Sequence, residues 1–193
     1  MNSRIKSIIK SSVENYTRFL NDSNLQINIE RFVSKSIDAF KNNSKILFCG
    51  NGGSAADAQH IASELSGRFY KDRPPLYAEA LHANTSYITA VANDYGYDET
   101  FARMVKASGR KGDVLVGIST SGNSPNVVKA MLIAKEMGML TVGFTGSKGG
   151  KMKDLCEIII QAPSNDTPRV QEVHILVGHI VCQLIEEEMF PNA

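Results

Sequence analysis

The chain has 193 residues, of which 42% are hydrophobic and 21% charged, as is ordinary for a soluble globular protein. A formal net charge of +1, without a run of Lys or Arg, gives no support for a nucleic-acid partner. No apolar stretch is long enough to span a membrane and the N-terminus has no signal-peptide core, so we expect a cytoplasmic protein without a membrane partner.

Helical spacing of apolar residues predicts two helices ahead of the first strand, one over 5–20 and one from about 29 to 40. The polar stretch 21–24 is expected to separate them. Packing against the domain would explain their apolar stripes. We favour a contact between subunits, because a long helix outside the strand–helix alternation often needs a partner. We therefore expect a single domain over 1–193, with 1–44 as a helical extension in the oligomer interface.

A short apolar strand, a glycine turn and a helix follow one another from Lys45 onward. A glycine turn lets a ligand approach the backbone, and the N–H groups at the start of a helix favour an anion. Residues 50–55 formally match the dinucleotide pattern, but the acidic residue that this pattern wants about 20 positions later is missing. We therefore favour a small ligand over a cofactor, with a plain strand–helix turn as the alternative. His60 and Glu64 lie four apart on this helix and share one face.

Strands and helices alternate along the rest of the chain, which predicts an α/β fold with a parallel sheet covered on both faces. Ligands bind at the carboxyl ends of such strands. The further elements expected are a weak strand over 76–81, a short helix over 86–93, a strand over 113–118, a helix over 125–137, strands over 140–145 and 156–160, and a C-terminal helix capped by Thr167 that reaches about Met189.

The turn from Ser119 to Ser124 offers four hydroxyl groups and several N–H groups, just before a helix that begins at Pro125. Hydroxyl and amide groups together can satisfy the oxygens of a phosphate without Lys or Arg. A serine-rich capping turn is the alternative. Because the glycine turn is expected at the same edge of the sheet, we favour phosphate binding.

Three polar residues of the last helix, Gln171, His174 and His179, complement His60 and Glu64. Burying such groups without partners is costly, so they need an explanation. A hydrogen-bonded network in the core is one. A metal site is another, since His, Glu and His can bind zinc, although an amide oxygen is an uncommon fourth ligand. A Glu and a His that face one pocket would also suit proton transfer.

Taken together, these motifs resemble the sedoheptulose 7-phosphate isomerases (phosphoheptose isomerases), which belong to the wider sugar isomerase, or SIS, fold. The resemblance covers nearly the whole chain and is highly specific as a set. It is carried by the runs 49–60, 92–94, 117–124 and 169–174, together with His179.

The resemblance implies a doubly wound, flavodoxin-like five-stranded parallel sheet and an aldose–ketose isomerisation. Sedoheptulose 7-phosphate would become D-glycero-D-manno-heptose 7-phosphate, an early step toward the activated heptoses of lipopolysaccharide core or capsule. It also implies a homotetramer with active sites between subunits and one zinc ion per subunit, held by His60, Glu64, Gln171 and His179. The substrate contacts that it implies are Asn51, Gly52, Gly53, Glu64, Asn93, Asp94, Ser119, Thr120, Ser121, Ser124 and Gln171.

The proposed reaction needs a proton to be taken from one carbon and returned to its neighbour through an enediol. A carboxylate and an imidazole on opposite sides of the sugar can do this, and we assign Glu64 as the base and His179 as the acid. A metal there could polarise the carbonyl and stabilise the enediolate. A carboxylate that holds zinc is a poorer base than a free one. Either Glu64 changes its coordination during turnover, or the metal mainly positions groups.

Three rival functions remain on the same fold. A non-catalytic SIS family that binds the replication initiator DnaA is similar in the glycine turn and the last helix, but lacks counterparts of Glu64 and His179. A phosphosugar-sensing regulator would usually add a DNA-binding domain, and too few residues precede the first strand for one. An isomerase for a five- or six-carbon phosphosugar stays open, because the sequence does not reveal the length of the pocket.

Overall fold

Five parallel strands form one sheet in the order β2-β1-β3-β4-β5 in the computed structural model, which describes residues 1–193. Ile46 at the start of β1 pairs with both Ala78 of β2 and Val114 of β3. This order is the flavodoxin-like form of a doubly wound sheet, so the predicted fold class is confirmed. The strands are β1 (Ile46–Gly50), β2 (Ala78–Ala80), β3 (Val114–Ile118), β4 (Leu140–Thr145) and β5 (Ile158–Gln161).

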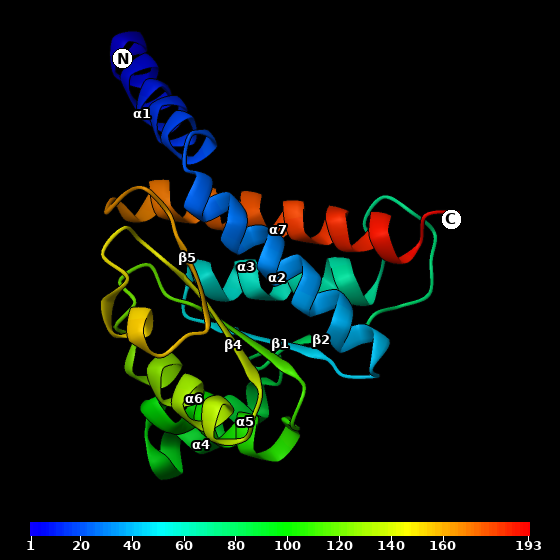
Figure 1. Ribbon diagram of the computed structural model, residues 1–193. Helices are drawn as coiled ribbons and strands as arrows, with labels where there is room; N and C mark the ends of the chain where they lie inside the picture. The colour runs from blue at the N-terminus through cyan, green and yellow to red at the C-terminus, as the bar shows by residue number, and fades with distance from the viewer.

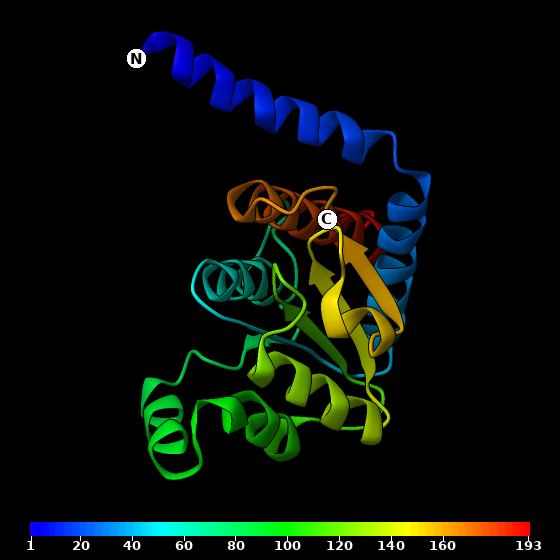
Figure 2. The same ribbon diagram turned by 90° about the vertical axis from the view of Figure 1, so that its left-hand side faces the viewer.

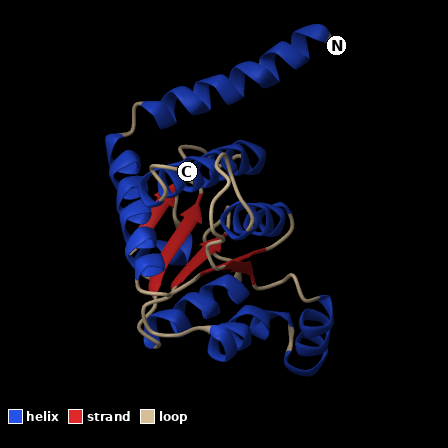
Figure 3. Ribbon diagram, turned by 90° about the vertical axis from the view of Figure 1, so that its right-hand side faces the viewer, coloured by secondary structure: helices blue, strands red, loops and turns tan.

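Helices cover both faces of this sheet (Figure 1), and the strands form the central layer between them (Figure 3). Successive residues of a strand point to opposite faces of the sheet, so Phe48 packs with the helices of one face and Leu47 with those of the other. Every residue of β1 and β3 is buried, as a sheet covered on both faces requires. One face carries α2 (Ser23–Lys41), α3 (Gly53–Ser66) and α7 (Thr167–Met189), and the other α4 (Thr85–Tyr95), α5 (Thr100–Ser108) and α6 (Pro125–Glu136).

The first helix, α1 (Asn2–Leu20), projects away from the body of the domain (Figure 2). Its C-terminal half is anchored, because Phe19 is buried and Asn15 Nδ2 donates a 2.9 Å hydrogen bond to the carbonyl oxygen of Arg169. The rest of its apolar stripe is uncovered, with side chains 51–58% exposed at Ile5, Ile8, Ile9 and Val13.

Helix α2 begins at Ser23, well before the predicted start near Ile29. The Asp22 side chain accepts a 3.0 Å hydrogen bond from the backbone N–H of Leu25 and so caps the helix. The polar stretch 21–24 therefore contains a helix start rather than only a break between helices.

Several other boundaries differ from those predicted. Helix α5 and the short 3₁₀ helices η1 (Tyr97–Glu99) and η2 (Gly150–Asp154) were not predicted. The last strand begins at Ile158 rather than Cys156, and β2 is shorter than the predicted 76–81. The cap of α7 is Asp166, so Thr167 is the first helical residue and Pro168 the second.

All three cysteines are free thiols. Burial raises the pKa of Cys156 and Cys182 to about 12, and raises that of the fully enclosed Cys49 as well. These thiols therefore stay protonated near neutral pH and do not supply a thiolate nucleophile. None of the helices combines the length and the apolar character that crossing a bilayer requires.

His174 of α7 is the histidine buried most deeply in the core. Its Nε2 donates to the carbonyl oxygen of Thr145 at 3.1 Å, while its Nδ1 is buried without a partner. Burial lowers the pKa of His174 from 6.5 to about 4, against a smaller opposing effect of the Thr145 hydrogen bond. The folded protein therefore keeps this imidazole neutral at pH values where the unfolded chain would protonate it.

We expect His174 to lower the free energy of unfolding by about 3 kcal/mol as the pH is lowered from 6.5 to 4, because only the unfolded chain binds a proton at His174 in that window. The raised pKa of Asp57 acts in the opposite direction, so the contribution of His174 is the difference between the wild-type protein and a His174 variant. Urea unfolding at a series of pH values measures this slope. His174→Leu should remove most of this slope even though the variant is less stable. An equal slope in both proteins would contradict the assignment to His174.

Candidate active site

The two polar turns meet where strands β1 and β3 end side by side. This is the switch point of the sheet, where successive connections leave toward opposite faces and a crevice opens. The amide groups of Asn51 and Asn126 exchange two hydrogen bonds of 2.9 Å across it, and the Tyr97 hydroxyl donates to Asn51 Oδ1 at 2.9 Å. These contacts fix the orientation of Asn51. The sequence did not single out Asn126 or Tyr97, because only the sheet order brings them to Asn51.

The glycine turn opens helix α3 without a side-chain cap. Gly52 occupies the N-cap position with a positive φ of 57°, which favours glycine. A Cβ at Gly53 would lie 2.5 Å from Gln171 Nε2, so the absence of a side chain there makes room for Gln171. The N–H groups of Ser54 and Ala55 donate to carbonyl oxygens of the turn, which leaves those of Gly52 and Gly53 as the donors for a ligand.

The serine turn gathers its hydroxyl groups at the start of α6. Ser119 Oγ lies 2.9 Å from Ser124 Oγ and 3.4 Å from Ser121 Oγ. Ser124 is the N-cap residue, but its hydroxyl makes no capping hydrogen bond to the helix. A Cβ at Gly122, where φ is 66°, would lie 2.0 Å from the Gly149 carbonyl oxygen, so only glycine allows this close packing. The arrangement leaves hydroxyl and N–H donors for an anion.

His60, Glu64 and His179 lie together farther along α3 and α7. His60 Nε2 is 3.3 Å from Glu64 Oε1 and 3.2 Å from His179 Nε2. The Glu64 side chain is 21% exposed and that of His60 is 50% exposed, so the group is open to a ligand. The predicted meeting of the two helices thus brings a carboxylate and two imidazoles to one place.

Gln171 does not join these three side chains. It lies two helical turns before His179 and packs against Gly53. Two ligands of a tetrahedral zinc ion, each bonded at about 2.0–2.2 Å, are roughly 3.4 Å apart, which is close to both distances from His60. However, no three His, Cys, Asp or Glu side chains in the chain form a group that could hold a metal ion as they stand. The donor types fit zinc, but the set would have to close around the ion by side-chain rotation.

Asp57 is a further acidic group on α3, one turn before His60, that the sequence did not single out. Its Oδ2 is buried without a partner, and burial raises the pKa of Asp57 to about 6, against a smaller lowering by His60. The predicted substrate contacts Asn93 and Asp94 are exposed on α4, where Asn93 Nδ2 donates to Asp94 Oδ1 at 2.9 Å. The hydrogen bond of Tyr97 to Asn51 holds this segment beside the glycine turn.

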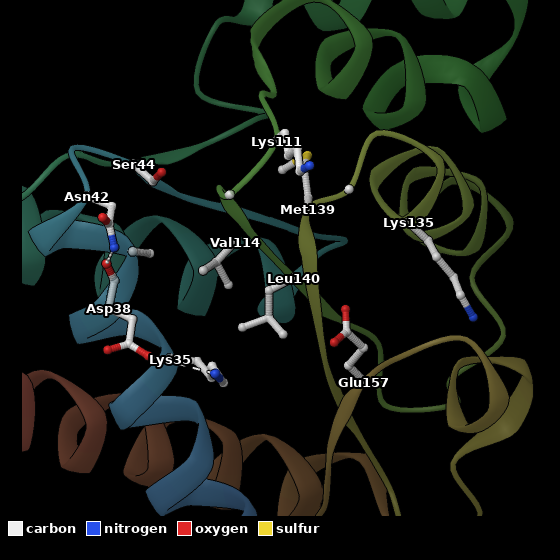
Figure 4. Close-up of a pocket in the computed structure, with 13 residues that line it drawn as sticks. Lys35, Asp38, Asn42, Ser44, Lys111, Val114, Lys135, Met139, Leu140 and Glu157 are labelled. Carbon is white, nitrogen blue, oxygen red and sulfur yellow. Dashed lines mark hydrogen bonds and ion pairs between the residues drawn. The ribbon is translucent and has the colours of Figure 1, made fainter.

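A cavity of about 710 Å³ lies away from this site (Figure 4). It lies at the opposite, amino-terminal edge of the sheet, against Val114 and Leu140, the first residues of β3 and β4. Its rim mixes Lys35, Lys111 and Lys135 with acidic side chains, and none of the predicted site residues lines it. The candidate active site remains the one that starts at the carboxyl edge, because parallel sheets place their ligands there, both polar turns lie there, and His60, Glu64 and His179 follow on the helices that leave this edge.

Comparison with known proteins gives a family for this fold and site. The family model of the SIS domain matches residues 11–146. The phosphoheptose isomerase of Aneurinibacillus thermoaerophilus is 52% identical over 192 residues, covering 100% of this chain and 97% of the relative. Phosphoheptose isomerase 2 of Campylobacter jejuni is 50% identical over 190 residues, covering 98% of this chain and 94% of the relative.

Solved structures agree with these relatives. Phosphoheptose isomerase GmhA from Neisseria gonorrhoeae superposes with a TM-score of 0.90 at 40% identity, covering 96% of this chain and 98% of that one. A phosphoheptose isomerase from Francisella tularensis gives a TM-score of 0.92 at 34% identity, covering 96% and 97%. The similarity therefore extends over the whole arrangement of helices and strands, including both helices that carry the candidate site.

Proposed function

The chain belongs to the phosphoheptose isomerase family of SIS-domain enzymes, and we propose that it converts sedoheptulose 7-phosphate to D-glycero-D-manno-heptose 7-phosphate. The product would enter the early steps of activated-heptose synthesis for lipopolysaccharide core or capsule. One observation carries the proposal: a hydroxyl-rich anion site lies at the carboxyl edge of the sheet, and α3 and α7, which both start at that edge, bring Glu64 and His179 together farther along their length.

The serine turn suits the phosphate end of the substrate. The hydroxyls of Ser119, Ser121 and Ser124 and the backbone N–H of Asn126, in the first turn of α6, can donate to phosphate oxygens. Asn51, Gly52 and Gly53 supply amide and backbone donors for the sugar hydroxyls. No cation is needed at this end, because several neutral donors and two helix dipoles share the negative charge.

The Glu–His pair suits the carbonyl end. We assign Glu64 to remove the proton from C1, giving an enediol, and to return it to C2. His179 would donate a proton to the C2 oxygen as the enediol forms and then take the proton of the C1 hydroxyl, so that the carbonyl moves from C2 to C1 and His179 returns to its starting state. His60 lies between the two groups and can orient both by its contacts of 3.3 and 3.2 Å.

Zinc belongs to this proposal as the resident metal. His60, Glu64 and His179 would hold it. Gln171, the fourth ligand that the resemblance implies, packs against Gly53 about two helical turns before His179, so rotation of its side chain does not bring it to the other three within one subunit. When bound, zinc would polarise the substrate carbonyl and stabilise negative charge on the enediolate. The two distances from His60 and the mixture of imidazole and carboxylate donors support this assignment.

We expect turnover of sedoheptulose 7-phosphate and much slower turnover of ribulose 5-phosphate and fructose 6-phosphate. Glu64→Gln and His179→Gln should each lower kcat at least about 100-fold, since each removes a group that transfers a proton. Glu187→Gln, an exposed change on the same helix as His179, should leave kcat unchanged. Wild-type turnover in either site variant would remove the assigned acid–base roles.

Metal analysis of the purified protein should find one zinc per subunit. His60→Ala should lower the zinc content and the activity together, whereas His82→Ala, a change after β2 and outside the proposed ligand set, should retain both. A metal content far below one per subunit, with activity unaffected by a chelator, would count against the site.

The exposed stripe of α1 supports a homotetramer. Ile5, Ile8, Ile9 and Val13 are all more than half exposed on a helix that projects from the body (Figure 2). A second copy of the chain is the occupant proposed for this stripe, with 1–44 as the interface extension of a single domain over 1–193. The three free thiols suit a reducing compartment, and we assign the enzyme to the cytoplasm on that basis.

Light scattering should give the mass of a tetramer for the wild-type protein. Ile9→Asp should reduce that mass, because it introduces a charge in the middle of the apolar stripe. Ser11→Asp, on the opposite side of α1, is the matched control and should leave the mass unchanged. A wild-type monomer, or an intact tetramer in Ile9→Asp, would contradict the proposed interface.

A further inference from the structure

A buried ion pair joins the end of α3 to α7 next to the site, and nothing in the proposed reaction uses it. Arg73 Nε donates to Glu186 Oε2 at 2.9 Å, and the two side chains are only 1% and 2% exposed. Arg73 belongs to the connection between α3 and β2, over 67–77, which carries no regular secondary structure. Burying two charges is costly, so the pair needs further hydrogen bonds to be stable there.

Glu186 obtains those hydrogen bonds from the connection itself. Its carboxylate accepts the backbone N–H groups of Phe69, Tyr70 and Lys71 at 3.1, 2.7 and 2.7 Å. Burial alone would raise the pKa of Glu186, but these three donors and the Arg73 guanidinium outweigh it, so the pKa lies below its ordinary value. One ionised carboxylate on α7 thus fixes three consecutive residues of the connection.

Arg73 binds the other side of the junction. Its guanidinium donates to the carbonyl oxygens of Glu64 and Leu65 at 2.8 and 2.7 Å, and to that of Gly67 at 3.1 Å. These carbonyls lie in the last turn of α3 or just beyond it, where no further helical N–H is available to them. The backbone of the proposed base is therefore held directly by Arg73.

Phe69 extends this arrangement to the proposed acid. Its ring stacks on the His179 ring, with centroids 5.7 Å apart and planes 29° from parallel. Glu186 lies seven residues after His179, two turns along the same helix, and holds the backbone N–H of Phe69. The ion pair is thus connected to Glu64 through Arg73 and to His179 through Phe69.

We propose that Arg73 and Glu186 are positioning residues of the isomerase, which set Phe69 against His179 and hold the helix end that carries Glu64. This proposal rests on the acid–base roles given above. Neither residue touches the substrate. Because proton transfer demands close alignment, a small displacement of either group should lower the rate of the chemical step more than it weakens substrate binding.

Kinetics of two variants test the proposal. Glu186→Gln removes the charge, and Phe69→Leu removes the ring. Each should lower kcat about 10-fold or more while KM stays within about twofold, because the phosphate-binding turn is untouched. Phe69→Tyr retains a ring on His179 and should restore kcat.

Asp113→Asn is the matched control for loss of a buried carboxylate. Asp113 accepts two backbone N–H groups, from Lys45 and Arg110, and the Lys45 ammonium at 2.6 Å. It lies just before β3, at the sheet edge away from the site. The Asp113→Asn variant should lose stability, as Glu186→Gln does, but keep the wild-type kcat. If Glu186→Gln also keeps the wild-type kcat, the pair is structural only and the proposal fails.

A double variant tests the route through Phe69. Phe69→Leu combined with Glu186→Gln should lower kcat by less than the product of the two single effects, since both act on His179. Fully multiplicative effects would show that Glu186 does not act through Phe69.

Nuclear magnetic resonance of the His179 ring protons provides a test that needs no turnover. Phe69→Leu removes the ring-current contribution and defines the shift expected when the stack is lost. Glu186→Gln should move the resonances toward that value, and Asp113→Asn should not. Unmoved resonances in Glu186→Gln would overturn the positioning role. If the wild-type protein turns over none of the three phosphosugars, the proposed function is wrong. The His179 resonances would still show whether the ion pair positions the His179 ring.

Discussion

The close packing of α3 against α7 is the contact on which the candidate site depends. A Cβ at Gly178 would lie 2.4 Å from Ile61 Cδ1, so only glycine allows the two helices to approach this closely. Their approach brings His60 and His179 to 3.2 Å although 119 positions separate them. Helix α3 follows β1 and α7 follows β5, so both helices leave the same edge of the sheet in the same direction. Gly53 and Gln171 are therefore neighbours near the helix starts, and His60 and His179 are neighbours farther along.

This geometry separates recognition of an anion from the chemistry. The donors for an anion are the starts of α3 and α6, and they involve no lysine or arginine side chain. The Asn51–Asn126 pair ties the two turns together across the switch point, so the two helix starts cannot shift independently. The imidazoles and the carboxylate lie farther along α3 and α7, so in the proposed reaction the phosphate would bind at a distance from the reacting carbons.

Much of the fold was predictable because its signals are local. The hydrophobic pattern of the sequence predicts the buried strands and the long helices, and Gly122 and Pro125 indicate the turn between β3 and α6. Helix α5 was missed because Thr100–Ser108 is short and starts from Glu99, which makes no capping hydrogen bond. The early start of α2 was missed because Asp22 can either break a helix or cap one, and only the hydrogen bond to Leu25 decides.

The site was predictable in part for a related reason. His60 and Glu64 share a helix, so their spacing alone puts them on one face of it, and strand–helix alternation brings α7, which carries His179, to the same face of the sheet as α3. Phe69 and Arg73 could not be found in this way, because the stretch 68–75 is typical of a basic surface connection that ends in two prolines, and nothing local in the sequence of the last helix pairs Glu186 with it.

A connection without regular structure must satisfy its backbone groups by other means, and here a single carboxylate does so for three N–H groups at once. One side chain can therefore hold an entire segment in one conformation, provided that it is ionised and that a cation shares its burial. The same requirement explains why Arg73, with its planar fork of donors, faces Glu186 on one side and the final carbonyls of α3 on the other. A lysine has one nitrogen and could not span both sets of acceptors. One buried interaction thus fixes the conformation of the connection, the position of the end of α3 and the packing of Phe69 on His179.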